Sequence, residues 1–165
     1  MQLLLRYFAI TEHELPPDLD HVPAFVEHLL PAYGSSEAGH RFALLGVEPN
    51  RLLVLEPRGA MLAGMPAAVE LGNVDAWLSQ ALLLDKCLGI TGGQVERQTH
   101  ITYMRDVREA ARAVSRGAEQ LALLLAPTPV SQLLDVARAG AVMPQKSTYF
   151  YPKLATGLVL RLFDA

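Results

Sequence analysis

The chain has 165 residues and a mass of 18.0 kDa, the size of one domain with a proper hydrophobic core. Hydrophobic residues make up 51% of it and charged residues 19%, which excludes a disordered chain and predicts a somewhat apolar surface. The formal net charge is −3 and the Lys and Arg residues are scattered, which argues against nucleic acid as a partner because phosphate neutralisation dominates such binding.

Membrane insertion and export are not expected. The longest apolar runs are far shorter than the roughly 20 residues that a membrane-spanning helix requires. The N-terminal residues lack the pattern of a signal peptide, and the single cysteine, Cys87, cannot form an internal disulfide. We therefore expect a cytoplasmic protein, in which Cys87 lies inside an apolar helical pattern as a buried small hydrophobic residue.

The first part of the chain is predicted to form a strand, a loop and a helix. Residues 3–10 are rich enough in aliphatic and aromatic side chains for a strand. Residues 11–20 are polar and contain Pro16-Pro17, which is typical of a loop. In residues 21–32 the apolar side chains recur on one face, which indicates an amphipathic helix.

The next segment is predicted to be a β-hairpin. Two short apolar runs, residues 40–47 and 51–55, flank Glu48-Pro49-Asn50, and this tripeptide suits a turn that contains proline. Residues 58–65 show no usable period, so we expect them to be irregular.

The middle of the chain is predicted to contain a helix, a turn and a strand. Apolar residues recur at helical spacing in residues 74–88, with Asn73 or Asp75 as the expected N-cap. Thr91-Gly92-Gly93 indicates a turn. Residues 100–104 alternate between polar and apolar side chains, which favours a strand.

The last part continues the alternation of helices and strands. Asp106 is expected to cap a helix that extends to residue 116. The unbroken apolar run of residues 121–126 is typical of a strand that is buried on both faces. Thr128 or Ser131 is expected to cap a helix that extends to residue 139, and residues 156–163 are predicted to be a final strand.

The order of these elements predicts the fold class. Alternation in the second half indicates an α/β layer structure, while the hairpin makes the sheet at least partly antiparallel. We therefore expect an α/β (α+β) fold, in which helices pack on a mixed sheet and residues 1–165 form a single domain.

The stretch richest in chemistry lies near the C-terminus, where Pro144 and Pro152 bracket lysines, hydroxyl groups and aromatic rings. Prolines restrict the backbone and aromatic rings supply rigid surface, so the polar groups between them are well placed to hold an anion. Lysine cations and hydroxyl donors suit a phosphate or carboxylate small molecule. The candidate ligand-binding residues of this stretch are Lys146, Ser147, Thr148, Tyr149, Tyr151 and Lys153.

Two other interpretations of this stretch differ in strength. Lys146-Ser147-Thr148 is similar to the end of a P-loop, but a P-loop needs a glycine-rich approach and a following helix, and neither is present. The second interpretation is a turn that packs its tyrosines against the sheet while the lysines stay in water. The residues alone leave the binding and the structural interpretation open.

A second candidate site lies at the junction of the predicted strand 100–104 and the helix after it. Ligands of open α/β sheets collect beyond the C-terminal ends of strands, where Tyr103 and Arg105 are expected. The alternative is a plain helix cap with a solvated arginine. The five histidines lack the tight spacing of a metal site, so no metal is expected. No nucleophile carries its base in a local signature, which leaves enzyme activity and cofactors unassigned.

The C-terminal sequence also resembles that of a known family. Residues 143–153 read Met-Pro-Gln-Lys-Ser-Thr-Tyr-Phe-Tyr-Pro-Lys, and Thr156-Gly157-Leu158-Val159 follows. This ending resembles the Met-Pro-x-Lys-Ser-Thr-Tyr-Phe-x-Pro-Lys signature of domain-of-unknown-function family 1015, a family of uncharacterised prokaryotic proteins. The resemblance spans most of the chain, more weakly before Asn73. Upstream it includes Asp75 before a helix ending in Leu88-Gly89-Ile90, Ile101-Thr102-Tyr103 with Arg105-Asp106, and Pro127-Thr128-Pro129.

The resemblance carries two departures and one functional implication. Members of that family are more than twice as long, and their N-terminal half has an Asp-Gly-His-His-Arg motif similar to that of ParB-like proteins, which this chain lacks. The chain therefore looks like a C-terminal half, and Gln80 stands where the family pattern implies a histidine. ParB-like folds include nucleotide-dependent enzymes, among them kinases for free serine, so the resemblance implies a nucleotide-linked or phosphotransfer role for the family.

Two functions follow as expectations. The first is that the domain supplies an anion-binding or phosphate-binding wall of a ligand site to a larger protein. The alternative is a structural or interaction module that packs against an N-terminal ParB-like half or a second copy of the chain.

Overall fold

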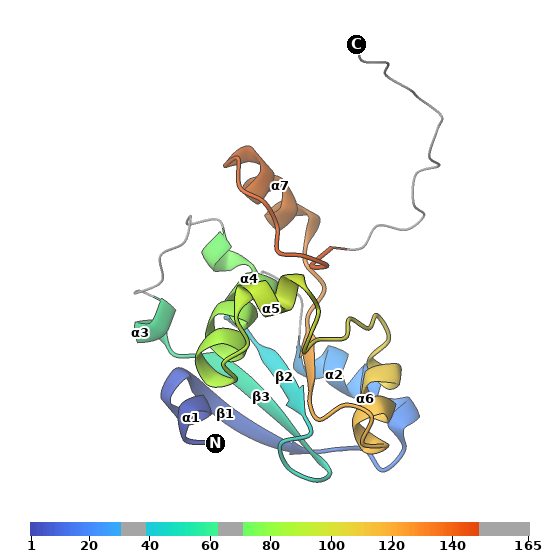
Figure 1. Ribbon diagram of the computed structural model, residues 1–165. Helices are drawn as coiled ribbons and strands as arrows, with labels where there is room; N and C mark the ends of the chain where they lie inside the picture. The colour runs from blue at the N-terminus through green and yellow to red at the C-terminus, as the bar shows by residue number, and fades with distance from the viewer. Residues whose placement is uncertain (31–38, 63–70, 149–165) are drawn as a thin grey trace, which may run out of the picture.

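The computed structural model describes residues 1–30, 39–62 and 71–148 of the chain. These residues form a four-stranded sheet with helices on both of its faces (Figure 1). The pairings of the strands are all antiparallel. The expected α/β class, with helices packed on a sheet that contains antiparallel pairs, is confirmed.

The sheet has the strand order β1-β3-β2-β4. The predicted hairpin is confirmed, because β2 and β3 pair from Leu45 opposite Leu52 to Phe42 opposite Leu55. In the turn between them Asn50 adopts a φ of 55°, a conformation that Asn tolerates better than most residues. The strands are β1 (Phe8–Glu14), β2 (Phe42–Leu45), β3 (Arg51–Pro57) and β4 (Ala122–Leu125).

One face of the sheet packs against three helices, and every second strand residue points toward them. Phe42 of β2 and Leu53 of β3 are fully buried on this side. The rings of Phe8 and Phe42 meet edge to face with their centroids 6.0 Å apart. Burying each such side chain stabilises the fold by about 1.5–3 kcal/mol, so these contacts hold the helices on the sheet. The helices of this face are α1 (Gln2–Tyr7), α4 (Asp75–Leu78) and the π-helix η3 (Ser79–Cys87).

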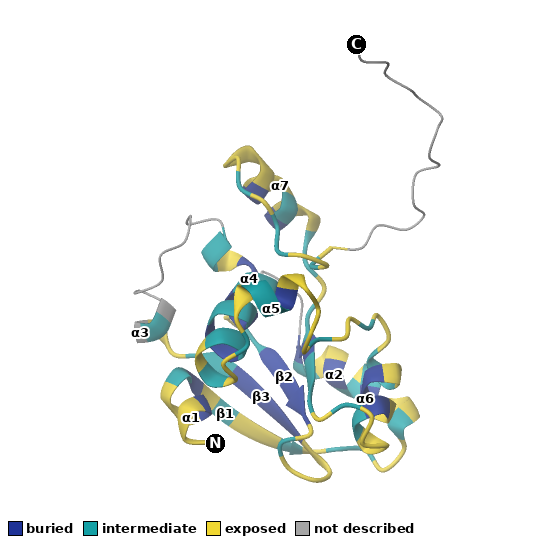
Figure 2. Ribbon diagram, viewed as in Figure 1, coloured by how far each residue is buried: buried dark blue, intermediate teal, exposed yellow. Residues whose placement is uncertain are grey.

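The other face of the sheet is covered by α2 (Val22–Leu29) and α6 (Val107–Ser115). Asp106 caps α6 as predicted, because its carboxylate accepts the main-chain N–H groups of Arg108 at 2.7 Å and Glu109 at 3.2 Å. The Arg112 guanidinium donates to Asp20 at 2.8 Å, which ties α6 to the short 3₁₀ helix η1 (Leu19–His21). Figure 2 shows the buried residues concentrated in β2, β3 and the helix faces turned toward them.

The predicted strand over residues 3–10 is wrong in its first half. Residues of this run form α1, and β1 begins at Phe8 and extends to Glu14, into the predicted loop. The run Leu3-Leu4-Leu5-Arg6 has high helix propensity, and a short apolar run alone does not distinguish a helix from a strand. Part of the segment predicted to be irregular, residues 58–65, forms α3 (Gly59–Leu62), while residues 63–65 lie outside the described residues.

The predicted helix over residues 74–88 is confirmed as α4 and η3, which follow the short 3₁₀ helix η2 (Leu71–Asn73), but its details differ. Neither Asn73 nor Asp75 caps it; the N-cap is Val74, without a side-chain hydrogen bond. Cys87 is partly buried rather than fully buried. Thr91, predicted to start a turn, forms a capping box with Gln94 and begins α5 (Gly92–Glu96).

Three predictions for the last part of the chain also differ from the structure. Residues 100–104 form no strand. The run 121–126 contains β4, which lies at one edge of the sheet. Of the four residues of β4, Leu124 is buried and the other three are half-buried. Neither Thr128 nor Ser131 caps α7 (Val130–Arg138), whose N-cap is Pro129. The predicted strand 156–163 lies outside the described residues. Within the part of the chain that the structure describes, no helix is long and apolar enough to cross a membrane.

Candidate functional site

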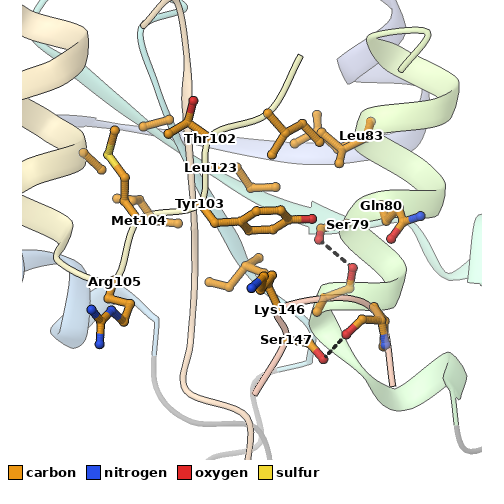
Figure 3. A pocket seen from close by; sticks show the side chains of 18 of the residues that line it. Ser79, Gln80, Leu83, Thr102, Tyr103, Met104, Arg105, Leu123, Lys146 and Ser147 are labelled. Atoms are coloured by element: carbon orange, nitrogen blue, oxygen red, sulfur yellow. Dashed lines mark hydrogen bonds between the residues drawn. The ribbon is translucent and has the colours of Figure 1, made fainter. Parts of the chain in front are cut away.

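A groove of about 1550 Å³ lies beside the sheet. It is lined by the π-helix η3, by the loop that connects α5 to α6, by β4 and the residues after it, and by the segment 144–148 (Figure 3). A π-helix is rare and is frequently found at functional sites. The groove therefore brings together segments that are distant in the sequence, including the described part of the proline-bracketed stretch.

The segment 144–148 enters the groove as a tight turn. The main-chain N–H of Ser147 donates to the Pro144 carbonyl at 3.3 Å, and the Ser147 hydroxyl donates to the same oxygen at 2.7 Å. The Thr128 hydroxyl in turn donates to the Ser147 carbonyl at 3.2 Å. The turn is thereby anchored just beyond the end of β4.

Lys146 occupies the strained position of this turn. Its φ is 60°, in the left-handed region, which Gly and Asn adopt far more readily than Lys. The side chain of Lys146 lines the groove, and it forms no ion pair with any residue that the structure describes. A left-handed conformation in a residue with a Cβ costs about 1 kcal/mol, and such strain concentrates at functional sites.

Tyr103 extends into the same part of the groove from the loop between α5 and α6. Figure 3 shows its ring directed toward Ser79 and Gln80 of η3, with Lys146 and Ser147 below it in this view. Tyr103 is 39% exposed, but the partial burial of its phenol raises the pKa above its ordinary value, because it disfavours the charged phenolate. The hydroxyl group stays a hydrogen-bond donor at neutral pH.

Gln80 also lines the groove, although it is not among the site residues predicted from the sequence. It lies within the π-helical segment, and its amide group carries two donors and one acceptor. The one signal in the sequence was its position, where the family pattern implies a histidine. Nothing in the residues around it indicated that this position lines the same groove as Tyr103 and Lys146.

The other predicted site residues are distributed as follows. Thr148 lines the groove beside Ser147, and Arg105 also lines it, but the Arg105 side chain points away from Tyr103 and Lys146 (Figure 3). Tyr149, Tyr151 and Lys153 lie outside the described residues. The structure thus brings Lys146, Ser147, Thr148 and Tyr103 to one groove and leaves Arg105 on a different side of it.

The charge of the groove is mixed. Its lining includes the cations Lys146 and Arg105 and the carboxylates of Glu27, Asp106 and Glu119, of which Asp106 is engaged as the cap of α6. An anion is therefore favoured locally, near the Lys146 ammonium, and not along the whole groove.

A buried, hydrogen-bonded side-chain pair lies outside this groove. The Nδ1 atom of His40 and the Oδ1 atom of Asp75 are 2.6 Å apart, and the side chains are 9% and 12% exposed. This contact joins the segment before β2 to the start of α4. Among the described residues, no group of three or more His, Cys, Asp or Glu side chains is arranged to hold a metal ion.

Comparisons with known proteins gave no match: no family model, no curated protein and no solved structure is similar to the chain at a significant level. The resemblance to domain-of-unknown-function family 1015 therefore stays a prediction.

Proposed function

We propose that this domain binds a small anionic molecule, a phosphate monoester or a carboxylate, at the end of the groove formed by Lys146, Tyr103 and Gln80. Lys146 supplies the positive charge, and the Tyr103 hydroxyl and Gln80 amide supply neutral hydrogen-bond donors. Thr148 adds a further hydroxyl group on the wall of the groove. The observation that carries the proposal is the left-handed lysine, held by a hydrogen-bonded turn with its side chain in the groove and without an ion pair among the described residues.

The cost of that conformation supports a binding role. A turn that served packing alone would be better formed by Gly or Asn at position 146, because neither is strained at a φ of 60°. A lysine at this position lowers the stability of the fold by about 1 kcal/mol. A contact between the lysine and a ligand is a physical reason to keep it there.

The expected affinity follows from the donors. A hydrogen bond to a charged group contributes about 1.5–3 kcal/mol, and each neutral one about 0.5–1.5 kcal/mol. One cation and two neutral donors thus amount to roughly 4 kcal/mol, which corresponds to a Kd near 1 mM for a simple anion. A larger ligand that also contacts the apolar wall of the groove would bind more tightly.

The resemblance to domain-of-unknown-function family 1015 suggests a wider role for this site. Tyr149, Tyr151 and Lys153 would complete the site from the remainder of the proline-bracketed stretch. The site would then serve a larger protein of family 1015, whose ParB-like half suggests a nucleotide-linked or phosphotransfer activity by analogy of fold alone.

The test is a titration of the isotope-labelled full chain with inorganic phosphate, phenyl phosphate and acetate, followed by amide chemical shifts at constant ionic strength. We expect a Kd near 1 mM for at least one of these anions, with shifts centred on residues 144–148 and on Tyr103. Lys146→Gln should weaken binding about tenfold, the effect of losing 1.4 kcal/mol, and should change the melting temperature little.

A matched control is available on the same protein. Lys86 is 55% exposed, pairs with Asp85 at 2.9 Å and does not line the groove, so Lys86→Gln should leave binding unchanged. Equal binding by the Lys146→Gln and wild-type chains would contradict the proposal. A large loss of stability in Lys146→Gln would instead make the turn structural.

A second function is supported by a separate surface. Met1, Leu3 of α1 and Leu88 after η3 are 53%, 48% and 40% exposed, and all three line one shallow pocket. Such a patch suits an interaction module that packs on a preceding domain or a second copy. Light scattering would show a dimer that the double variant Leu3→Ser and Leu88→Ser disrupts; a monomer at high concentration would exclude self-association.

A further inference from the structure

The groove follows one edge of the sheet. All residues of β4 line it, and so do residues of η3 and of α6, which cover opposite faces of the sheet. In the strand order β1-β3-β2-β4, β4 is the last strand, and β2 is its one partner among the described residues. The groove therefore lies between the two layers of helices, and the outer edge of β4 forms part of its wall.

The main-chain groups on this edge favour a peptide ligand. Every second residue of a strand directs its N–H and C=O groups to the same side, so part of the main chain of β4 points away from β2. Within the described part of the chain, no main-chain hydrogen bond reaches these groups, and none reaches residues 100–104, which line the same groove. A peptide carries a matching donor and acceptor at each residue, whereas a purely apolar ligand would leave these groups unsatisfied.

The side chains along the edge favour an apolar ligand of more than ordinary size. Leu123 and Leu125 of β4, Leu84 of η3 and Ile101 are half-buried and line the groove. The strand has no charged residue or proline, whereas β1 at the other edge carries the exposed Glu12, a usual protection against pairing. The volume of about 1550 Å³ exceeds the roughly 300–1,000 Å³ of small-molecule pockets. An extended segment of chain fits this groove better than a compact ligand does.

The two ends of this edge carry charges of opposite sign. Beyond the C-terminal end of β4, Thr128 holds the turn that places Lys146 in the groove. Before the N-terminal end, the lining includes Glu119. The strand between them is about 13 Å long, which an extended peptide of about four to six residues spans. The other charged residues of the lining come from α2 and from the connection between α5 and α6: Glu27, Arg105 and Asp106.

We infer that the groove binds the C-terminal end of another protein as an extended peptide, which pairs with β4 as a parallel strand and places its terminal carboxylate at Lys146. Parallel pairing follows from the charges, because it puts the carboxylate beside the lysine and the upstream residues of the peptide near Glu119. The tail has apolar residues at alternate positions and no acidic residue at its upstream end. In Figure 3, Tyr103 lies between Leu123 and Lys146, where it borders the last residue of the peptide.

This inference rests on the proposed function, because the same lysine holds the anion, and it names that anion as a peptide carboxylate. In such complexes the main-chain hydrogen bonds supply affinity and the alternate side chains supply specificity. The probe is the unlabelled peptide Lys-Thr-Val-Thr-Val-Leu with a free carboxylate, titrated into the isotope-labelled full chain. It should bind at least about tenfold more tightly than acetate, because it adds main-chain and apolar contacts to the same charge.

The C-terminal amide of the same peptide tests the carboxylate. The amide should bind about tenfold more weakly than the acid, and Lys146→Gln should remove this difference, whereas Lys86→Gln should not. Acid and amide that bind the wild-type chain equally would overturn the inference. If acetate and the acid bind equally and both depend on Lys146, the peptide is refuted and the anion site stands. If neither binds, both proposals fail.

N-methylation of the probe tests the pairing with β4. One methylated probe carries the methyl groups on the nitrogens of its valines, and the other on those of its threonines, so the two block N–H groups on opposite edges of the peptide. One of them should bind about tenfold more weakly than the other. The outward amides of β4 should also exchange about tenfold more slowly when the unmodified probe is bound. Equal binding of the two methylated probes would overturn the pairing.

The direction and the source of the strand are tested on the same protein. Replacing the first lysine of the probe with glutamate should weaken binding about threefold, and Glu119→Gln should remove this effect. No effect of that replacement would overturn the parallel orientation. Outward β4 amides that are already protected without the probe would also overturn the inference, and light scattering would then assign the edge to the chain itself in a monomer or to a second copy in a dimer.

Discussion

Replacing Lys146 with Asn should make the fold more stable and its binding of anions weaker. The φ of 60° at this position is unfavourable for Lys and equally so for Ala, but Asn adopts it readily. Lys146→Asn should therefore raise the free energy of unfolding by about 0.5–1 kcal/mol, whereas Lys146→Ala should leave it nearly unchanged. Lys146→Gly should fall between them, because the strain it relieves is offset by about 0.4–1 kcal/mol of added entropy in the unfolded chain.

The assay is thermal unfolding of the three variants beside the anion titration. For a domain of this length, 0.5–1 kcal/mol corresponds to an increase in melting temperature of about 1–4 °C for Lys146→Asn. All three variants lose the ammonium group, so each should bind the anion about tenfold more weakly. An asparagine variant no more stable than the alanine variant would show that the left-handed turn carries no strain. An asparagine variant with wild-type affinity would show that the lysine has no binding role.

Two further predictions follow from single residues. Gly46 has a φ of 93°, and a Cβ there would collide with the main-chain oxygen of Gln120. Gly46→Ala should therefore lower the free energy of unfolding, measured with urea, by about 3 kcal/mol or more. Gly72→Ala is the control, because a Cβ at Gly72 meets no atom within 4 Å and should not have this cost. Burial raises the pKa of Tyr103 from 10.0, so the stability that its protonated phenol contributes is fully present below the unfolded pKa and is lost as the pH rises through the folded pKa. Ultraviolet titration of tyrosinate should show that Tyr103→Phe removes a component that ionises above the ordinary pKa of tyrosine; loss of a component at the ordinary pKa would contradict the partial burial of the Tyr103 phenol.

The features that the sequence predicted correctly are set by local chemistry. The hairpin depends on two apolar runs and the turn residues between them, and the start of α6 depends on an aspartate that accepts the next free N–H groups. The class of fold follows from the succession of such elements. These signals act over a few residues, so they survive without knowledge of tertiary contacts.

The features that could not be predicted from the sequence are set by tertiary contacts. The run at Leu3–Leu5 carries no period that separates a helix from a strand, and the π-helical path of η3 leaves no mark in the spacing of its apolar residues. Gln80, Tyr103 and Lys146 line one groove because three separate segments meet beside β4. Candidate residues were found by their chemistry, but their grouping depends on the fold.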